Sequence, residues 1–312
     1  MKIAVYGTGG VGAYFGGRLA LAGHDVTFLA RGENLRALRT HGLHMQSVHG
    51  DFHLPHVPAT DTPAAIGPAD AVLLAVKTWQ VPAVAAQLAP LLAPHTLVVP
   101  LQNGVEAADQ VAAAVGWAHT LAGYCRVIAQ QLAPGRFAHL GVQPSVAFGT
   151  VGPVPLEAPA EELRAAFRQA GVSVETPANL QQALWEKFLF VEPWGSVGAA
   201  SRSPIGQMRR VPETQALLRG CLHELLAVGR AQGLAWAEDA IAKVWRLYAE
   251  APAAGTSSMQ RDLMEGRPSE LEAQTGAVVR LGQATHTPTP IHEVLYAALL
   301  PQEQRARATE TR

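Results

Sequence analysis

The chain has 312 residues, a formal net charge of −1 and a charged fraction of 16%. This length allows two domains that each bury a core, and the near-neutral charge provides no basic surface for nucleic acid or for an anionic membrane. The longest apolar runs are strand-length and too short to span a bilayer. We therefore expect a globular protein with a small-molecule partner, without nucleic-acid or membrane partners.

The cysteine content and the first residues indicate the compartment. Cys125 and Cys221 are far apart in the sequence and belong to no metal or redox motif. We interpret them as buried thiols in a reducing environment. The chain begins with one lysine and then a glycine-rich loop, which is not the pattern of a signal peptide. These features predict a cytoplasmic protein.

The strongest signal lies in the first 31 residues. An apolar strand at 2–6 leads into a glycine-rich segment, then into a helix that extends to about residue 22, and a second strand follows at 25–30. A glycine fingerprint between a strand and a helix predicts a dinucleotide-binding site, although an ordinary glycine-rich turn is the alternative. The residues that we expect to bind the dinucleotide here are Gly7, Thr8, Gly9, Gly10, Val11 and Gly12.

Three of these glycines have distinct expected roles. Gly7 allows a tight turn, Gly9 lets the backbone approach a pyrophosphate, and Gly12 lets the helix pack closely on the strand. The N-terminus of the following helix then offers N–H groups and a partial positive charge to the phosphates. The motif therefore predicts how the loop would bind a dinucleotide.

Arg31 suggests which dinucleotide is bound. NAD sites usually carry an acidic residue about 20 residues after the glycines, where it binds the ribose 2′-hydroxyl. This chain has Arg31 at that place, and a guanidinium pairs well with a 2′-phosphate. Glu33 and Asp25 are near enough in sequence to leave NAD open as an alternative. The sequence favours NADP(H).

The rest of the first half alternates strands and helices. Continuous apolar runs, rather than alternating ones, predict strands covered on both faces and hence a parallel sheet. The expected elements are, in order, a hairpin within 43–57, a strand at 70–76, a helix at 81–92, a strand at 96–100, a helix at 105–115, a β-rich stretch at 121–148, a helix at 161–170 and a strand at 172–175.

Five histidines gather in the predicted hairpin region: His41, His44, His49, His53 and His56. No cysteine joins them, and their spacing matches no established set of metal ligands. We interpret them as solvated histidines and predict no metal site.

Beyond about residue 177 the pattern becomes helical. We predict an α/β fold with a Rossmann-type doubly wound sheet at 1–178, followed by an all-helical domain at 179–312. A polar, frayed tail is expected from residue 302. The predicted helices are 180–190, 212–232, 238–249, 269–283 and 291–299.

Lys187 is the best candidate for a chemical role in the second half. It lies in a segment that is otherwise apolar and aromatic, so its ammonium is expected to be partly desolvated and able to donate a proton near neutral pH. The alternative is a surface lysine that pairs with Glu186 or Glu192. Composition alone favours this alternative.

Five separated segments, in order, resemble the ketopantoate reductases (2-dehydropantoate 2-reductases). They are KIAVYGTGGVGAYFGGRLALAGHDVTFLAR at the start, AVLLAVKTWQ around Lys77, LQNGVE around Asn103, LWEKF around Lys187, and TSSMQRDLMEGRPSELE from Thr256 to Glu272. The resemblance extends over nearly the whole chain and is far more specific than the glycines alone.

This resemblance implies roles for individual residues. Lys187 corresponds to the catalytic lysine, the general acid that protonates the ketone oxygen, and Glu270 to a glutamate that contacts the substrate and supports the lysine. Ser258 corresponds to a contact of the substrate carboxylate, and Asn103 to an asparagine between the nicotinamide ribose and the substrate. Lys77 and Arg31 correspond to a pair that faces the 2′-phosphate.

Two of these roles have simpler alternatives. Glu270 follows Pro268 and Ser269 and could be a solvated carboxylate at the start of a helix. Ser258 could be a helix cap, which is a common position for serine.

The chain departs from the family pattern where the substrate would bind. The resemblance implies asparagines four and eight residues after the lysine, but Val191 and Gly195 occupy these positions. Another expected asparagine is replaced by Gly255, and Trp194 adds a large apolar group. A pocket without these amides loses discrimination for a substrate hydroxyl. The true substrate and the pathway therefore stay open.

The sequence thus predicts NADPH-dependent reduction of a 2-oxo acid to a 2-hydroxy acid, similar to the conversion of 2-dehydropantoate to pantoate in pantothenate biosynthesis. The alternatives are a related hydroxyacid or ketone dehydrogenase with another substrate, and an NADPH-binding sensor without turnover. The oligomeric state is expected to be a monomer or a homodimer.

Overall fold

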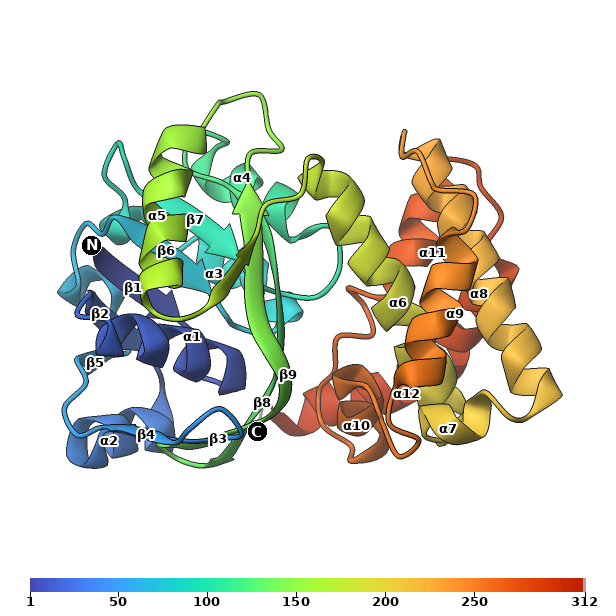
Figure 1. Cartoon of the computed structure of the whole chain (residues 1–312), viewed down its shortest axis with the longest axis horizontal. Helices are drawn as coiled ribbons and strands as arrows, with labels where there is room; N and C mark the ends of the chain where they lie inside the picture. The colour runs from blue at the N-terminus through green and yellow to red at the C-terminus, as the bar shows by residue number, and fades with distance from the viewer. Residues whose placement is uncertain (311–312) are drawn as a thin grey trace. The chain divides into compact units, whose positions relative to one another are not determined.

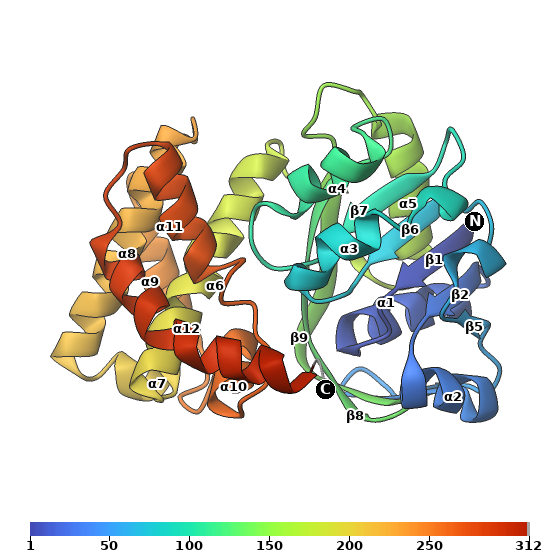
Figure 2. The same cartoon turned by 180° about the vertical axis from the view of Figure 1, so that it is seen from behind.

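The computed structural model describes residues 1–310, which form two compact units (Figures 1 and 2). The first unit contains residues 1–102 and 107–181. The second contains the helical residues from 182 onward together with the short segment Asn103–Glu106. That this segment belongs to the second unit was not anticipated from the sequence.

A five-stranded parallel sheet forms the centre of the first unit. Its order, β5-β2-β1-β6-β7, places the first strand of the chain in the middle. The strands β1, β6 and β7 are almost entirely buried, which explains their continuous apolar sequences. The strand bounds are β1 Lys2–Tyr6, β2 Asp25–Leu29, β5 Ala59–Thr60, β6 Ala71–Leu74 and β7 Leu97–Pro100.

Helices α1 and α3 connect strands of this sheet, as predicted for a Rossmann-like domain, and α2, which follows β2, was not predicted. The predicted helix at 81–92 is wrong in its extent, because α3 ends at Ala85 and only a 3₁₀ turn follows at Ala89–Leu91. Pro90 lies in that turn, and a proline there disfavours continuation of the α-helix because it lacks a backbone N–H and crowds the preceding turn. The helix bounds are α1 Gly10–Leu21, α2 Gly32–His41, α3 Val81–Ala85, α4 Ala107–Val115 and α5 Glu157–Gln169.

A second sheet packs with α1 and α5 in the same unit. Its strands are β3 Leu43–Ser47, β4 Phe52–Leu54, β8 Ala122–Ala133, β9 Arg136–Gly149 and β10 Ser173–Glu175. The antiparallel pair β3–β4 confirms the predicted hairpin, and β8 with β9 forms the long green hairpin in Figure 1. The aromatic rings of Phe15, Phe148 and Phe167 meet in the shared core.

Every element described in the second unit is a helix, which confirms the predicted helical domain. Helix α6 was predicted to end at 190 but continues to Ser201, and α10 was not predicted. The helix from Pro290 reaches Glu310, so the prediction of a frayed tail is wrong within the described residues; residues 311–312 lie outside them. The bounds are α6 Leu180–Ser201, α7 Ile205–Met208, α8 Pro212–Ala231, α9 Ala240–Glu250, α10 Ser258–Met264, α11 Thr275–Ala284 and α12 Pro290–Glu310 (Figure 2).

The C-terminal helix is ordered by a buried carboxylate. Glu303 on α12 accepts hydrogen bonds from the backbone N–H of Ser269 at 2.9 Å and from its hydroxyl at 2.5 Å. Arg307, one turn further along α12, pairs with Glu303 at 2.6 Å and donates to the carbonyl of Ser269 at 3.2 Å. These long-range contacts extend the helix through a sequence whose polarity alone suggested fraying.

Three charged side chains are buried together between the helices of the second unit. The Nε2 atom of His292 lies 2.8 Å from Glu192 on α6, and its Nδ1 atom lies 2.6 Å from Glu224 on α8. Burial alone would lower the pKa of His292, but the charges of the two glutamates and their hydrogen bonds raise it to about 9. The protonated imidazole therefore links α6, α8 and α12 at neutral pH.

No helix within residues 1–310 has the length and apolar content needed to cross a membrane.

We predict that the free energy of unfolding falls as pH rises from about 7 to 10. Because the pKa of His292 is about 9 in the folded protein and about 6.5 in an unfolded chain, protonation favours folding. This contribution is complete below pH 6.5 and is lost as pH rises through 9; it amounts to at most about 3 kcal/mol. Urea unfolding at several pH values measures it.

A His292→Gln variant is the control, because it removes the titrating imidazole while leaving Cys221 and Tyr248 unchanged. Burial also raises the pKa of both of these groups, so their titration adds to the fall in the free energy of unfolding of the wild type at high pH. In the variant, the free energy of unfolding should fall less steeply with pH. An equal slope in both proteins would contradict the assignment.

Candidate active site

The glycine-rich loop leaves the carboxyl end of β1 in a conformation that requires glycine. Gly7 has φ +97°, and a Cβ there would lie 2.7 Å from the backbone nitrogen of Val76. A Cβ on Gly12 would lie 2.0 Å from the carbonyl oxygen of Gly7, so α1 packs against the loop without space for a side chain. By contrast, a Cβ on Gly9 would meet nothing within 4 Å. The loop is therefore tight on its inner side and open at Gly9.

Gly10 has a packing constraint that the motif does not predict. A Cβ there would lie 2.4 Å from the carbonyl oxygen of Ala129, because strand β8 passes directly against the start of α1. The absence of a side chain at this position is thus explained by packing within the first unit. Direct binding of a dinucleotide by Gly10 stays a prediction, as it does for Val11 beside it.

Asn34 fixes the loop from the other side and was not singled out in the sequence. Its Nδ2 donates to the carbonyl of Thr8 at 2.8 Å, and its Oδ1 accepts from the backbone N–H of Gly135 at 2.9 Å. The hydroxyl of Thr8 in turn donates to the carbonyl of Leu29 at 3.1 Å. One amide therefore ties the loop to the β8–β9 turn; the helix that carries it, α2, was not among the predicted elements.

Arg31 and Lys77 follow the two strands that flank β1. Arg31 comes just after β2 and Lys77 shortly after β6, and both are exposed at the carboxyl edge of the parallel sheet, like the glycine loop. This edge is where open α/β sheets bind ligands. Of the nearby carboxylates, Asp25 starts β2 and so lies at its opposite end, and Glu33 pairs with Arg36. The arrangement favours cationic side chains at this edge.

Asn103, Lys187 and Glu270 lie together in the second unit. The Nζ atom of Lys187 donates to Oδ1 of Asn103 at 2.9 Å, and Nδ2 of Asn103 donates to Oε2 of Glu270 at 3.3 Å. The amide therefore has its oxygen toward the ammonium and its N–H toward the carboxylate. Sequence positions separated by up to 167 residues thus meet in one hydrogen-bonded chain.

The segment that carries Asn103 is fixed firmly within the second unit. Gly104 has φ +96°, and a Cβ there would lie 2.8 Å from the carbonyl of Ala273. Val105 packs against the apolar core of the unit, and Glu106 pairs with Arg280 at 2.7 Å. These contacts place the Asn103 amide beside the segment that contains Glu270.

The structure bears on the pairing of Lys187 with Glu192 and on the solvated position considered for Glu270. Lys187 is half-buried between the buried Trp185 and Phe188. Glu192 is fully buried against His292, so it is not a surface partner for the lysine. Glu270 is only 7% exposed, so it is not a solvated carboxylate at a helix start.

Ser258 is the first residue of α10, and its neighbour is the cap. The hydroxyl of Ser257 accepts from the N–H of Gln260 at 3.0 Å, while the side chain of Gln260 accepts from the N–H of Ser257 at 3.4 Å. The capping role that was the alternative for Ser258 therefore belongs to Ser257. A contact of Ser258 with a substrate carboxylate stays a prediction.

The positions that depart from the family pattern are closely packed. A Cβ at Gly195 would lie 2.7 Å from Cε of Met259, and a Cβ at Gly255 would lie 3.1 Å from Cζ2 of Trp194. The methionine and the indole therefore occupy space that asparagine side chains would need. Apolar groups take the place of amides here.

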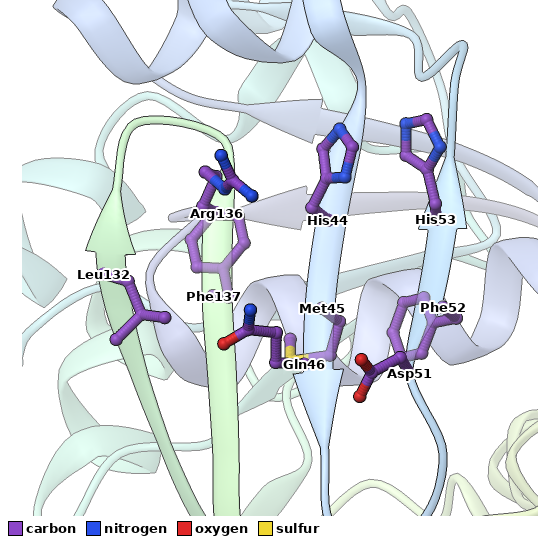
Figure 3. Close-up of a pocket in the computed structure, with 9 residues that line it drawn as sticks. All are labelled: His44, Met45, Gln46, Asp51, Phe52, His53, Leu132, Arg136 and Phe137. Carbon is purple, nitrogen blue, oxygen red and sulfur yellow. The ribbon is translucent and has the colours of Figure 1, made fainter.

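A separate hollow of about 340 Å³ lies on the second sheet and contains none of the predicted site residues (Figure 3). His44 and His53 face each other across β3 and β4 with ring centroids 3.7 Å apart, and Arg136 is beside them. Within residues 1–310 no group of three His, Cys, Asp or Glu side chains is placed to hold a metal ion.

The Rossmann-like first unit with its glycine loop, together with the helical second unit, has the architecture of the two-domain nucleotide-binding oxidoreductases. The chain belongs to the ketopantoate reductase PanE/ApbA family: the model of the family's N-terminal part matches residues 3–153, and the model of its C-terminal part matches residues 179–303. The sequence resemblance is thereby confirmed.

Individual relatives cover nearly the whole chain. A 2-dehydropantoate 2-reductase of Mycobacterium tuberculosis is 31% identical, covering 95% of this chain and 96% of its own. The crystal structure of a PanE/ApbA family ketopantoate reductase from Ralstonia eutropha has a TM-score of 0.89 at 32% identity, covering 98% and 100% of the two chains. D-mandelate dehydrogenase, with NADH and anilino(oxo)acetate, has the same fold at a TM-score of 0.89 and 20% identity, covering 98% and 100%.

We predict unequal losses of stability when one methyl group is added at two glycines of the loop. Gly12→Ala should destabilise the fold by about 1–3 kcal/mol, because its Cβ collides with the carbonyl of Gly7. Gly9→Ala, the matched control, should cost less than about 1 kcal/mol, because its Cβ enters open space. Urea unfolding without cofactor measures both; similar losses would contradict the packing described for the loop.

Proposed function

We propose that this protein is a cytoplasmic enzyme that uses NADPH to reduce a 2-oxo acid to the corresponding 2-hydroxy acid. The observation that carries the proposal is the pair of hydrogen bonds that links Lys187 to Asn103 and Asn103 to Glu270. It brings a proton donor, an orienting amide and a carboxylate together in a member of the ketopantoate reductase family. Reduction of a ketone needs a donor for the oxygen and groups that orient the substrate.

The residues at the sheet edge fit a phosphorylated dinucleotide. The open space beside Gly9, at the N-terminus of α1, suits a pyrophosphate. Arg31 and Lys77 supply two positive charges on either side of the glycine loop, which favours a cofactor with a 2′-phosphate. NADPH, when bound, supplies the hydride for the reduction.

Lys187 would donate a proton from Nζ to the ketone oxygen as negative charge develops there. Asn103 accepts from Nζ at 2.9 Å and so limits the directions in which the ammonium can point. Glu270 accepts from the same amide and fixes its orientation. We assign Ser258, the first residue of α10, to the substrate carboxylate, as the family resemblance implies, since a hydroxyl can donate a hydrogen bond to an anion.

The family relatives suggest 2-dehydropantoate as a substrate, but the packing around α6 favours a different 2-oxo acid. Val191, Gly195 and Gly255 provide no amide for a substrate hydroxyl, and Trp194 and Met259 fill the space beside the two glycines. Apolar surfaces discriminate weakly and accept apolar substituents. We infer that the substrate carries an apolar group next to its oxo acid.

The proposal is tested by NADPH oxidation with a panel of 2-oxo acids that contains 2-dehydropantoate, branched aliphatic acids and phenyl-substituted acids. We expect turnover, with a higher kcat/KM for the acids that lack a hydroxyl. A preference for 2-dehydropantoate would support the enzyme class and contradict the inferred pocket. NADPH binding without oxidation of any acid would contradict the proposed function and favour a sensor.

We predict that Lys187→Ala lowers kcat by about 10²–10⁴-fold, because the proton donor is lost. The KM for NADPH should stay within about twofold, since we assign the lysine to the substrate ketone and not to the 2′-phosphate. Lys187→Arg is the control: it keeps the positive charge, but a guanidinium does not give up its proton. If Lys187→Arg retained wild-type turnover, the role of the lysine as an acid would be wrong.

We predict that Arg31→Ala raises the KM for NADPH by roughly tenfold to hundredfold, because a charge-assisted contact with the 2′-phosphate is lost. The KM for NADH should change little. Arg36→Ala provides a matched control, since Arg36 is an exposed arginine on α2 that pairs with Glu33. Equal effects of Arg31→Ala on both cofactors would contradict the assignment of the 2′-phosphate site.

A further inference from the structure

The carboxylate of Glu270 is held by two amides from different segments. Its Oε2 atom accepts from Nδ2 of Asn103 at 3.3 Å and from Nε2 of Gln274 at 3.2 Å. Glu270 is 7% exposed and Gln274 is completely buried. Two donors that converge on one oxygen restrict rotation of a carboxylate more than either would alone.

Packing alone does not explain why a glutamine occupies the buried position 274. It precedes the first residue of α11, and its backbone N–H donates to the carbonyl of Glu270 at 3.0 Å. Its side-chain Oε1 is buried and has no hydrogen-bond partner within residues 1–310. A buried carbonyl without a partner destabilises a fold, and leucine fills a similar volume without that cost. The unpaired carbonyl therefore offsets part of the stability that the N–H contact with Glu270 provides.

We propose that Gln274 is a positioning residue for the reduction, which orients the Glu270 carboxylate and through it the Asn103 amide and the Lys187 ammonium. This inference rests on the proposed function. The orientation of the Gln274 amide is set by chemistry, because an ionised carboxylate only accepts hydrogen bonds and so faces the N–H side. Without this donor, the Gln274 amide would no longer restrain Oε2 of Glu270, and the carboxylate could turn away from Asn103.

The next residue provides a matched control for a purely structural role. Thr275 is also completely buried, and its hydroxyl donates to Oε1 of Glu192 at 2.9 Å. This contact supports the buried ion pairs of His292 with Glu192 and Glu224, and takes no part in the hydrogen bonds that link Lys187, Asn103 and Glu270. Removing the hydroxyl leaves a buried carboxylate oxygen without a donor, which should affect stability more than chemistry.

The test compares Gln274→Leu with Thr275→Val, using the best substrate of the panel. We expect Gln274→Leu to lower kcat about tenfold to hundredfold, as a misplaced donor would. Its KM for NADPH should equal that of the wild type. Its urea midpoint should fall less than that of Thr275→Val, because loss of the donor to Glu270 is offset by removal of the unpaired Gln274 carbonyl. Thr275→Val should show the reverse: a lower urea midpoint with nearly unchanged kcat. Unchanged kcat in Gln274→Leu would overturn the proposal.

A second variant separates positioning from general damage to the fold. Gln274→Glu places a like charge against Glu270, so the acid limb of the kcat–pH profile should move to higher pH. If the acid limb of the kcat–pH profile did not shift, and kcat and the urea midpoint fell in parallel, the role of Gln274 as a positioning residue would be contradicted.

Crystal structures of the wild type and Gln274→Leu test the inference without turnover. The Asn103–Glu270 and Lys187–Asn103 contacts should persist in the wild type, and the Glu270 carboxylate should turn in the variant. Superposable contacts in both would overturn the role of Gln274. If the wild type reduced no acid of the panel, the proposed function would fail while this structural comparison still decided the orientation of Glu270.

Discussion

The hydrogen-bonded bridge that Asn103 makes between Lys187 and Glu270 is the interaction on which the site depends. A half-buried ammonium and a buried carboxylate are costly unless both are satisfied, and one amide does this because its oxygen and its N–H face opposite charges. The polypeptide makes this possible because the four residues Asn103–Glu106 belong to the second unit, although the residues before and after them belong to the first. Gly104, Val105 and Glu106 fix this excursion by close packing, apolar burial and an ion pair.

The helical unit supports the bridge with buried polar groups more than with apolar contacts alone. Glu303 fixes the backbone before Glu270 through Ser269, and Gln274 contacts the carboxylate itself. Beside them, His292 links Glu192 and Glu224 and so sets the register of α6 against α8 and α12. Networks of this kind specify one arrangement of helices, because partial satisfaction in a low-dielectric interior is strongly unfavourable. The geometry near Lys187 is therefore set by side chains far apart in the sequence.

Local patterns in the sequence predicted the elements well where one rule dominated. The strand–glycine–helix order at 2–22 and the buried strands at 70–76 and 96–100 follow directly from periodicity and from the motif. Prediction was weaker where tertiary contacts decide: the helix after Pro290 extends through a polar tail because Glu303 and Arg307 anchor it, and Gly10 is small because β8 crosses it. For the site, family resemblance selected Lys187, Asn103 and Glu270, but no sequence pattern indicated Asn34, Gln274 or the capping of α10 by Ser257. Their roles depend on contacts between segments that are not adjacent, or on which of two serines begins a helix.

The central claim is that Lys187, oriented by Asn103, is the proton donor to the oxygen of a bound 2-oxo acid. A crystal structure with NADPH and the unreactive analogue oxamate tests it most directly, through the distance between Nζ of Lys187 and the amide oxygen that replaces the ketone. The account predicts hydrogen-bond contact, about 2.6–3.2 Å, with the Asn103–Glu270 contact retained. Oxamate bound beside the nicotinamide with Nζ more than about 5 Å from that oxygen, beyond the reach of a hydrogen bond, would contradict it.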